Sequence, residues 1–122
     1  MEALFAFEKL EVWQKARTFN KTIYQITSNF PYNERSNLVE QLRRAANSIP
    51  SNIAEGSGRL GSKQFIHFLS ISYGSLMEVF SHLILAYDLE YISNEQLADM
   101  RIKASEIAKM IKSLRYKLST MP

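Results

Sequence analysis

The chain has 122 residues, carries a net charge of +3 and contains no cysteine. Hydrophobic residues make up 46% of it and charged residues 22%, which is typical of a globular protein and excludes an intrinsically disordered chain. The lack of cysteine excludes a disulfide scaffold, a cysteine-ligated metal site and a cysteine nucleophile. The length predicts a single domain over residues 1–122. The first residues lack the pattern of a signal peptide, so a cytoplasmic location is expected.

Two helices are predicted in the first half of the chain, over about residues 8–29 and about residues 34–55. Each has one apolar stripe at helical spacing, and Pro31 separates the two. The first stripe is Val12, Ala16, Phe19, Ile23, Ile26 and Phe30. The second stripe is Leu38, Leu42, Ala45, Ile49 and Ile53.

Pro50 lies inside the second predicted helix, where the missing N–H and the bulky ring cost about 3 kcal/mol. Short polar neighbours can supply side-chain partners to the freed backbone groups, so a helix kinked at Pro50 is predicted. Glu55 would lie at the helix C-terminus, where negative charge is disfavoured, so Arg59 or Arg44 should pair with it. This cluster either repairs and caps the helix or lines a shared surface or pore. Its members are Asn47, Ser48, Pro50, Ser51, Asn52 and Glu55.

The third helix is predicted over about residues 62–89, with Ser62 as a plausible N-cap. It has two apolar stripes about 100° apart around the axis, whereas a helix of a four-helix monomer normally has one. The first stripe is Phe65, Leu69, Ser72, Leu76, Val79, Leu83 and Ala86. Either this helix is the most central one, or the second stripe is a subunit interface, which we favour because a large exposed apolar patch promotes aggregation. The candidate interface residues are Ile66, Tyr73, Met77, Phe80, Ile84 and Tyr87.

The segment Phe65–Tyr87 contains no lysine or arginine and only one carboxylate, Glu78, which raises the question of a membrane span. It also contains two histidines and four serines, so it is not a continuous apolar stretch. A buried helix explains it better, and no membrane partner is expected.

The fourth helix, over about residues 94–119, has the clearest local start signal. Its apolar stripe is Leu97, Met100, Ala104, Ile107, Ile111, Leu114 and Leu118. Ser93 and Gln96 have the spacing of a capping box, and Ile92 and Leu97 that of a hydrophobic staple. No segment alternates with period two for long enough to predict a strand. Four helices with short connections predict an all-α, antiparallel up-down four-helix bundle.

Several motifs resemble those of the bacterial family known as 23S rRNA intervening-sequence proteins. Two of them are RRAANSIPSNIAEGSGR, residues 43–59 around Pro50, and SKQFIHFLSISYGSLMEV, residues 62–79. The others are FEKLEVWQKA from Phe7 to Ala16 and the F-P-x-x-E turn from Phe30 to Glu34. The family often has GLTSQ before the double arginine, whereas this chain has NLVEQ, which places a carboxylate, Glu40, on that turn of the helix.

The resemblance implies a four-helix bundle that assembles as a ring, typically a homopentamer, without an established enzymatic activity. Family members are encoded within insertions in 23S rRNA genes, and many others stand alone. A similar bundle is the accessory protein of diversity-generating retroelements. It associates with a reverse transcriptase and with nucleic acid. The resemblance therefore suggests RNA or DNA and a protein such as a reverse transcriptase as partners.

The positive charge is concentrated at the end of the chain. Residues 101–122 hold six basic side chains and one acidic, whereas residues 1–100 hold nine basic and eleven acidic. A basic last helix is also favoured by its own dipole, and a lysine-bearing outer face is often simply solvated. Nucleic-acid binding is the preferred hypothesis, and a protein–protein scaffold is the alternative. The candidate nucleic-acid-binding residues are Arg43, Arg44, Arg59, Lys63, Lys109, Lys112 and Arg115.

Enzyme chemistry finds little support in the sequence. His67 and His82 would lie about 22 Å apart on one helix and cannot share a metal within a subunit. The glycines from Gly56 to Gly61 lack the GK[ST] ending and the preceding strand of a phosphate-binding loop. No catalytic residue, metal or cofactor is predicted, and an enzyme with a site between subunits is a distant third hypothesis.

Overall fold

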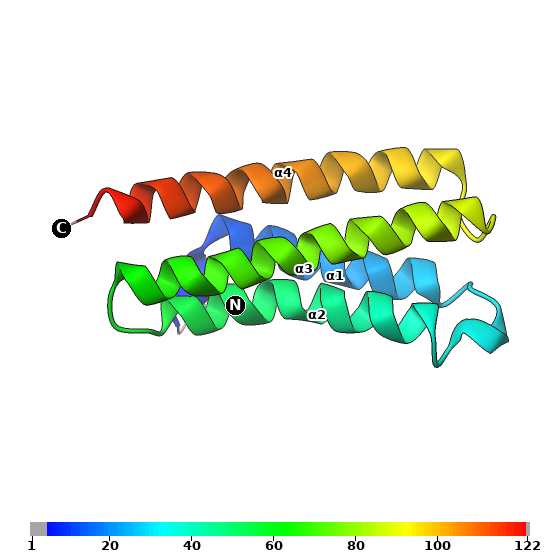
Figure 1. Cartoon of the computed structure of the whole chain (residues 1–122), viewed down its shortest axis with the longest axis horizontal. Coiled ribbons are helices and arrows are strands. Elements are labelled where there is room, and N and C mark those ends of the chain that lie inside the picture. The colour runs from blue at the N-terminus through cyan, green and yellow to red at the C-terminus, as the bar shows by residue number, and fades with distance from the viewer. Residues whose placement is uncertain (1–4, 122) are drawn as a thin grey trace.

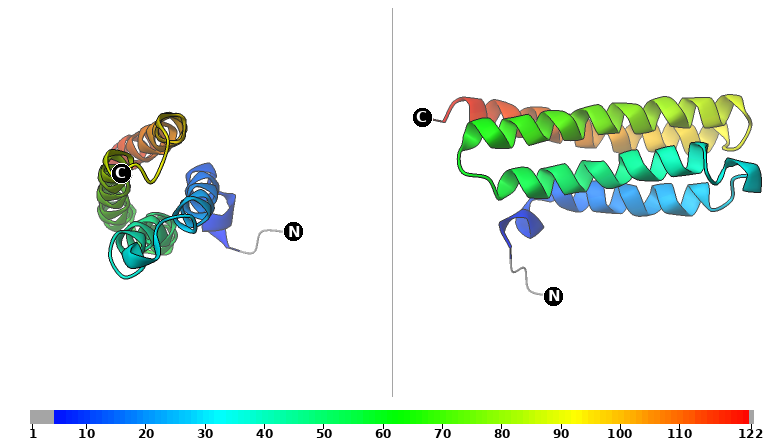
Figure 2. Two further views of the ribbon diagram at one scale, coloured as in Figure 1. Left: turned by 90° about the vertical axis from the view of Figure 1, so that its right-hand side faces the viewer. Right: turned by 60° about the horizontal axis from the view of Figure 1, so that its bottom comes forward.

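The computed structural model describes residues 5–121. This part of the chain forms four α-helices and two short 3-10 helices, and it contains no strand. The α-helices are α1 (Glu11–Thr27), α2 (Leu38–Ser57), α3 (Ser62–Asp88) and α4 (Asn94–Ser119); the 3-10 helices are η1 (Ala6–Lys9) and η2 (Tyr32–Glu34). Consecutive helices run antiparallel and are joined by short turns (Figure 1). The end view places the four helices around a common centre, which confirms the predicted all-α bundle (Figure 2).

The start of each of the first two helices differs from the prediction. Leu10 is extended, with ψ at 122°, and it separates η1 from α1, which begins at Glu11 rather than near residue 8. Residues 32–34 form η2, and α2 begins only at Leu38. The first members of the two apolar stripes, Val12 and Leu38, lie at the observed helix starts, so the predicted starts had run upstream of the apolar pattern.

The two predicted helix caps had different outcomes. Ser93 Oγ accepts a hydrogen bond from the Gln96 backbone N–H at 3.1 Å, and Gln96 Oε1 accepts one from the Ser93 N–H at 2.8 Å, which confirms the capping box. The assignment of Ser62 as a cap was wrong. Gly61 holds the N-cap position with φ at +97°, a conformation that favours glycine, and Ser62 is the first residue of α3.

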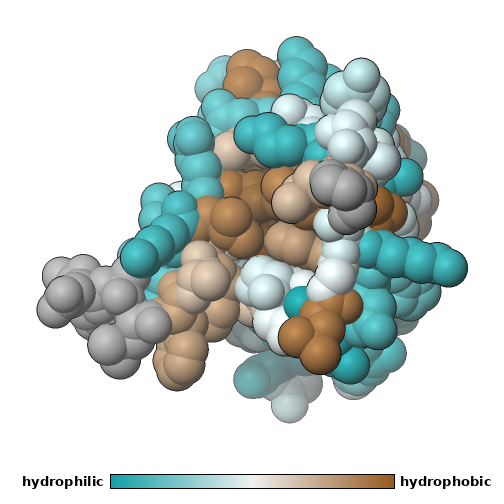
Figure 3. Space-filling view, turned by 90° about the vertical axis from the view of Figure 1, so that its left-hand side faces the viewer, coloured by the Kyte–Doolittle hydropathy of each residue, from teal (hydrophilic) through white to brown (hydrophobic). Residues whose placement is uncertain are grey.

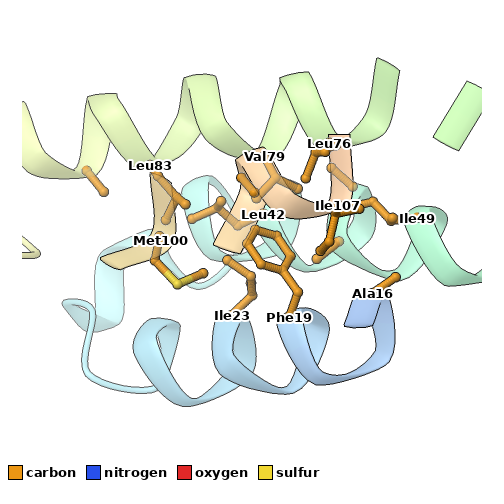
Figure 4. Close-up of a cluster of buried hydrophobic side chains, with 14 of the residues drawn as sticks. Ala16, Phe19, Ile23, Leu42, Ile49, Leu76, Val79, Leu83, Met100 and Ile107 are labelled. Atoms are coloured by element: carbon orange, nitrogen blue, oxygen red, sulfur yellow. The ribbon is translucent and has the colours of Figure 1, made fainter. Parts of the chain in front are cut away.

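The predicted apolar stripes meet in the core, where all four helices contribute fully buried side chains (Figure 4). Phe19 and Ile23 of α1 face Leu42 of α2, with α3 and α4 closing the layer around them. Burial of one such side chain contributes roughly 1.5–3 kcal/mol. The members of the stripes that remain half-buried are Ile26, Phe65, Leu114 and Leu118.

Candidate nucleic-acid interface

Charge is distributed unevenly along the bundle axis. The end that contains the start of α1 and the C-terminal part of α4, on the left in Figure 1, comprises residues 5–18, 48–75 and 107–121. It holds nine basic and three acidic side chains, a net charge of +6. The opposite end, residues 19–47 and 76–106, holds six basic and eight acidic side chains, a net charge of −2. We call these the basic half and the acidic half.

The structure separates the seven candidate nucleic-acid-binding residues into two groups. Arg43 and Arg44 lie in the acidic half, near the start of α2. The other five lie in the basic half: Arg59, Lys63, Lys109, Lys112 and Arg115. Residues 43 and 57 of α2 are about 21 Å apart by helical rise, so one sequence motif supplies arginines to opposite ends of the bundle.

Two of these arginines already have carboxylate partners. Arg44 pairs with Glu40 at 2.7 Å, and Arg59 pairs with Glu55, as predicted for one of the two arginines. Exposed pairs of this kind contribute about 0–1 kcal/mol but locally neutralise the cation. By contrast, four of the five candidate residues in the basic half form no ion pair with any described residue: Lys63, Lys109, Lys112 and Arg115. Lys117, which the sequence reasoning missed, is likewise unpaired among the described residues.

The basic half also has an apolar centre. Figure 3 looks at this end and shows hydrophobic side chains surrounded by hydrophilic ones. A cavity of about 510 Å³ opens between α1 and α4, and Lys109 and Lys117 lie along it. Its apolar lining consists of Leu10, Val12, Met110 and Leu114. Cations therefore project beside partly accessible apolar surface at this end.

A second group of cations borders α3. Lys112 Nζ lies 5.3 Å from the centre of the Tyr73 ring, and Arg101 lies 4.6 Å from that of Phe80. Lys112 and Arg115 also line a cavity of about 380 Å³ between α3 and α4. Cations thus lie beside aromatic rings on this side of the bundle, which is a chemistry suited to nucleic acid as well as to protein contacts.

The six candidate interface residues of α3 occupy two environments. Ile66, Tyr73 and Phe80 are half-buried. The other three remain exposed over about two-fifths of their surface: Met77 (42%), Ile84 (41%) and Tyr87 (39%). By length and hydropathy α3 also qualifies as a membrane-spanning helix, yet only 28% of its most apolar 18-residue window is buried. Much of the apolar surface of α3 is thus left unpartnered within one copy of the chain.

Gly74 lies within α3 and is exposed. A methyl group at this position would meet nothing within 4 Å. Glycine in a helix interior costs about 1 kcal/mol relative to alanine, and the packing of a single copy gives no reason for it here.

The polar cluster around Pro50 makes bonds within α2 and to α3. The helix continues through Pro50. Ser51 Oγ donates to the Asn47 carbonyl at 2.7 Å, and Asn52 Nδ2 donates to the Ser48 carbonyl at 2.8 Å. Ser75 of α3 donates to Ser48 Oγ at 2.8 Å, so the cluster also joins the two helices. These bonds hold the cluster within α2 and against α3, but among the described side chains none donates to the Ala46 carbonyl, the group that Pro50 leaves without its helical N–H partner.

Asn47 and Arg43 connect α2 to α1 instead. Asn47 accepts from Asn20 Nδ2 at 2.8 Å and donates to the Tyr24 hydroxyl at 3.0 Å. Arg43 donates to Thr27 Oγ1 at 3.0 Å and to the Tyr24 carbonyl at 3.3 Å, with its guanidinium 4.5 Å from the centre of the Tyr24 ring. A cation at this point stabilises the C-terminal end of α1. Arg43 therefore has a structural role that the sequence did not reveal.

Other titratable groups form pairs. His82 Nε2 lies 3.6 Å from Oε2 of Glu78, which is four residues earlier in α3. Tyr91 donates to Glu34 Oε2 at 2.7 Å, and this bond, together with burial and the carboxylate charge, raises the pKa of Tyr91. Across residues 5–121, no three side chains of the metal-ligating types gather in one place.

The model of the 23S rRNA-intervening sequence protein family matches residues 8–113. The chain belongs to this family. A solved structure, that of a protein of unknown function from the S23 ribosomal protein family of Bacteroides thetaiotaomicron VPI-5482, is 28% identical in sequence. It superposes with a TM-score of 0.78 over 86% of this chain and 95% of the other. No curated protein matches the chain.

Most of the candidate nucleic-acid-binding residues lie within the part of the chain that matches the family model. The span that matches the 23S rRNA-intervening sequence protein family includes Lys63, Lys109 and Lys112 but ends before Arg115 and Lys117. The family name associates these proteins with 23S rRNA genes. The Bacteroides protein has a similar fold, and its function is unknown.

Proposed function

We propose that this protein is a non-catalytic, cytoplasmic accessory factor that binds RNA through its basic half. The observation that carries the proposal is the net charge of +6 on one end of the bundle, where seven of the nine cations form no ion pair with any described residue. Such a surface binds phosphates, weakly selects sequence and loses affinity as salt rises. The association of the family with rRNA genes favours RNA over DNA.

The proposal includes assembly through α3. The exposed residues Met77, Ile84 and Tyr87 form an apolar face. A ring of identical copies, with a pentamer favoured by the family resemblance, would repeat the basic half and multiply its field. A reverse transcriptase is the protein partner that the resemblance suggests.

The RNA proposal is tested by titrating a labelled structured RNA and following its anisotropy from about 50 mM salt upwards. Reversal of Lys109, Lys112 and Arg115 to glutamate should abolish most binding and reduce the slope of log K against log salt by about two to three units. The matched control reverses Lys21, Arg44 and Lys103 in the acidic half, which changes the net charge equally. Absence of RNA binding by the unmodified protein at about 50 mM salt, or equal losses in both variants, would refute the proposal.

A protein–protein scaffold is the second candidate function, and the exposed apolar face of α3 is the observation in its favour. Light scattering tests whether that face contacts another copy of the chain. Ile84→Glu should reduce the assembly to a folded chain of 14.1 kDa. Ile71→Glu is the control, because Ile71 is equally exposed but lies about 140° away around α3. A monomeric unmodified protein would leave the face free for a different protein.

A further inference from the structure

The turn between α1 and α2 forms a pocket of about 370 Å³ in the acidic half, at the right of Figure 1. We call it the turn pocket. Phe30 contributes apolar surface to it, and Thr27 and Ser28 lie at its edge with their hydroxyl-bearing side chains. The lining also includes the aromatic ring of Tyr32 and the cationic side chains of Arg35 and Arg43, which could bind a ligand. Its volume lies in the range of small-molecule sites, at the lower end.

Both arginines of the turn pocket lack a carboxylate partner among the described residues. The nearby carboxylate of Glu34 is engaged elsewhere, because it accepts from the Tyr91 hydroxyl at 2.7 Å and from Asn37 Nδ2 at 3.2 Å. Arg43 uses two N–H groups on α1 and has further donors on the same guanidinium. The pocket is therefore locally cationic although the acidic half has a net negative charge.

The aromatic ring at the pocket is unusually accessible. Tyr32 is 80% exposed, although it lies in a turn that Pro31 and η2 hold in shape. The Arg35 guanidinium lies 5.2 Å from the centre of its ring. Folding buries little of this tyrosine, so the core does not account for its presence. A tyrosine ring beside an arginine plane is a surface on which an unpaired base stacks.

We propose that the turn pocket binds one unpaired nucleotide of an RNA chain. The base stacks on Tyr32, and Arg35 and Arg43 contact the adjacent phosphate. A base within a duplex is not available for stacking on Tyr32, so the pocket selects single-stranded segments, loops or bulges. This inference rests on the proposed RNA-binding function and assigns a second contact to it. The basic half holds phosphates without regard to structure, and the turn pocket adds a preference for unpaired RNA.

The test compares two labelled RNAs of equal length and charge, one fully paired and one with an unpaired loop. Tyr32→Leu should weaken binding of the looped RNA about tenfold, the size of one base stack, and leave the paired RNA unchanged. Tyr32→Phe, which keeps the ring, should bind like the unmodified protein. Tyr116→Leu is the comparison variant, because Tyr116 is a similarly exposed tyrosine, at 73%, beside Lys112 and Arg115 in the basic half, where any loss of binding should affect both RNAs equally. Circular dichroism verifies that each variant is folded.

Arg35→Gln provides a second measurement. It should lower affinity for the looped RNA and reduce the salt slope by about 0.7, which corresponds to one phosphate contact on a single strand. A photocrosslink from a 4-thiouridine placed in the loop should map to Tyr32 and its neighbours.

The outcomes separate the two proposals. If the unmodified protein binds RNA but Tyr32→Leu behaves like Tyr116→Leu and no crosslink reaches the turn, the turn pocket is refuted and the basic half remains the RNA contact. If the unmodified protein binds neither RNA, both proposals fail together. Loss of the loop preference in Tyr32→Leu and Arg35→Gln, with paired RNA unaffected, supports the turn pocket.

Discussion

The two apolar faces of α3 are built from consecutive residues but have different surroundings. Leu76 and Leu83 are fully buried, whereas Met77 and Ile84, their immediate neighbours in the chain, are exposed. The inner face lies in the core shared by the four helices. On the outer face, Tyr73 and Phe80 pack against the edge of that core and contact Lys112 and Arg101 of α4, whereas Met77 and Ile84 remain exposed. One copy of the chain therefore buries only part of the apolar surface of α3.

The comparison is tested most strongly by truncating one residue on each face. Leu83→Ala should lower the free energy of unfolding by about 2–5 kcal/mol, because it opens a cavity in a dense core. Ile84→Ala should change it by about 0.5 kcal/mol or less in the dissociated chain, as for an ordinary surface position. Denaturant unfolding at low protein concentration measures both. Similar losses from the two variants would mean that the outer face also belongs to the core.

Two glycines extend the comparison to backbone positions. Gly56 of α2 faces the inner side of α3, where a Cβ would come within 2.8 Å of both Phe65 and Phe68. Gly56→Ala should therefore destabilise the fold by about 1–3 kcal/mol, as overpacking does in other cores. A thermal or denaturant midpoint reports the change, and an unaltered midpoint would show that the two helices can separate without cost.

Gly74 lies on the solvent side of α3, about 60° around the helix from Met77, and its substitution should have the opposite sign. Gly74→Ala should stabilise the dissociated chain by about 1 kcal/mol, because the methyl group has room and alanine is the better helix former. If a second copy packs closely there, the same substitution should weaken assembly, which sedimentation or light scattering detects. Greater stability without any effect on assembly would show that the contact between copies does not involve Gly74.

The smallest expected effect concerns the connection after α3, where Tyr91 reaches across to Glu34. The raised pKa of Tyr91 means that folding favours the protonated hydroxyl. This contribution is complete below the ordinary tyrosine pKa of about 10 and is lost as the pH rises through the higher value of the folded state. Tyr91→Phe should therefore lose stability at neutral pH but show a weaker decline above pH 10. Parallel pH profiles for the two proteins would contradict this.

Local patterns predicted much of the fold. Helical spacing identified the four core stripes, and the capping box at Ser93 formed as expected, because both depend on residues within one or two turns of each other. The start of α1 was misplaced, because η1 precedes the helix and the extended Leu10 at its start has no capping side chain that the sequence could reveal. Ser62 has the composition of a cap but not the position, because Gly61 makes the turn.

The candidate site was predictable only in part. The excess charge of the last helix pointed to Lys109, Lys112 and Arg115, and these lie together with Lys63 in the basic half. Arg43 could not be assigned from the sequence, because its partners on α1 are 16 and 19 residues away. The turn pocket depends on Arg35 and Arg43, which belong to different segments and meet only in the folded chain.

The sequence by itself determined four amphipathic helices and the family, because helical periodicity and the Pro50 motif are local and survive without a folded context. Only the tertiary structure determined which charged side chains lie at the same end of the bundle. The twenty residues of α2 extend for about 30 Å, so a compact motif distributes its arginines to opposite ends, and antiparallel packing brings the end of α4 beside the turn between α2 and α3. The same packing left Met77, Ile84 and Tyr87 of the second stripe of α3 exposed, whereas periodicity located that stripe but left open whether the bundle buries it.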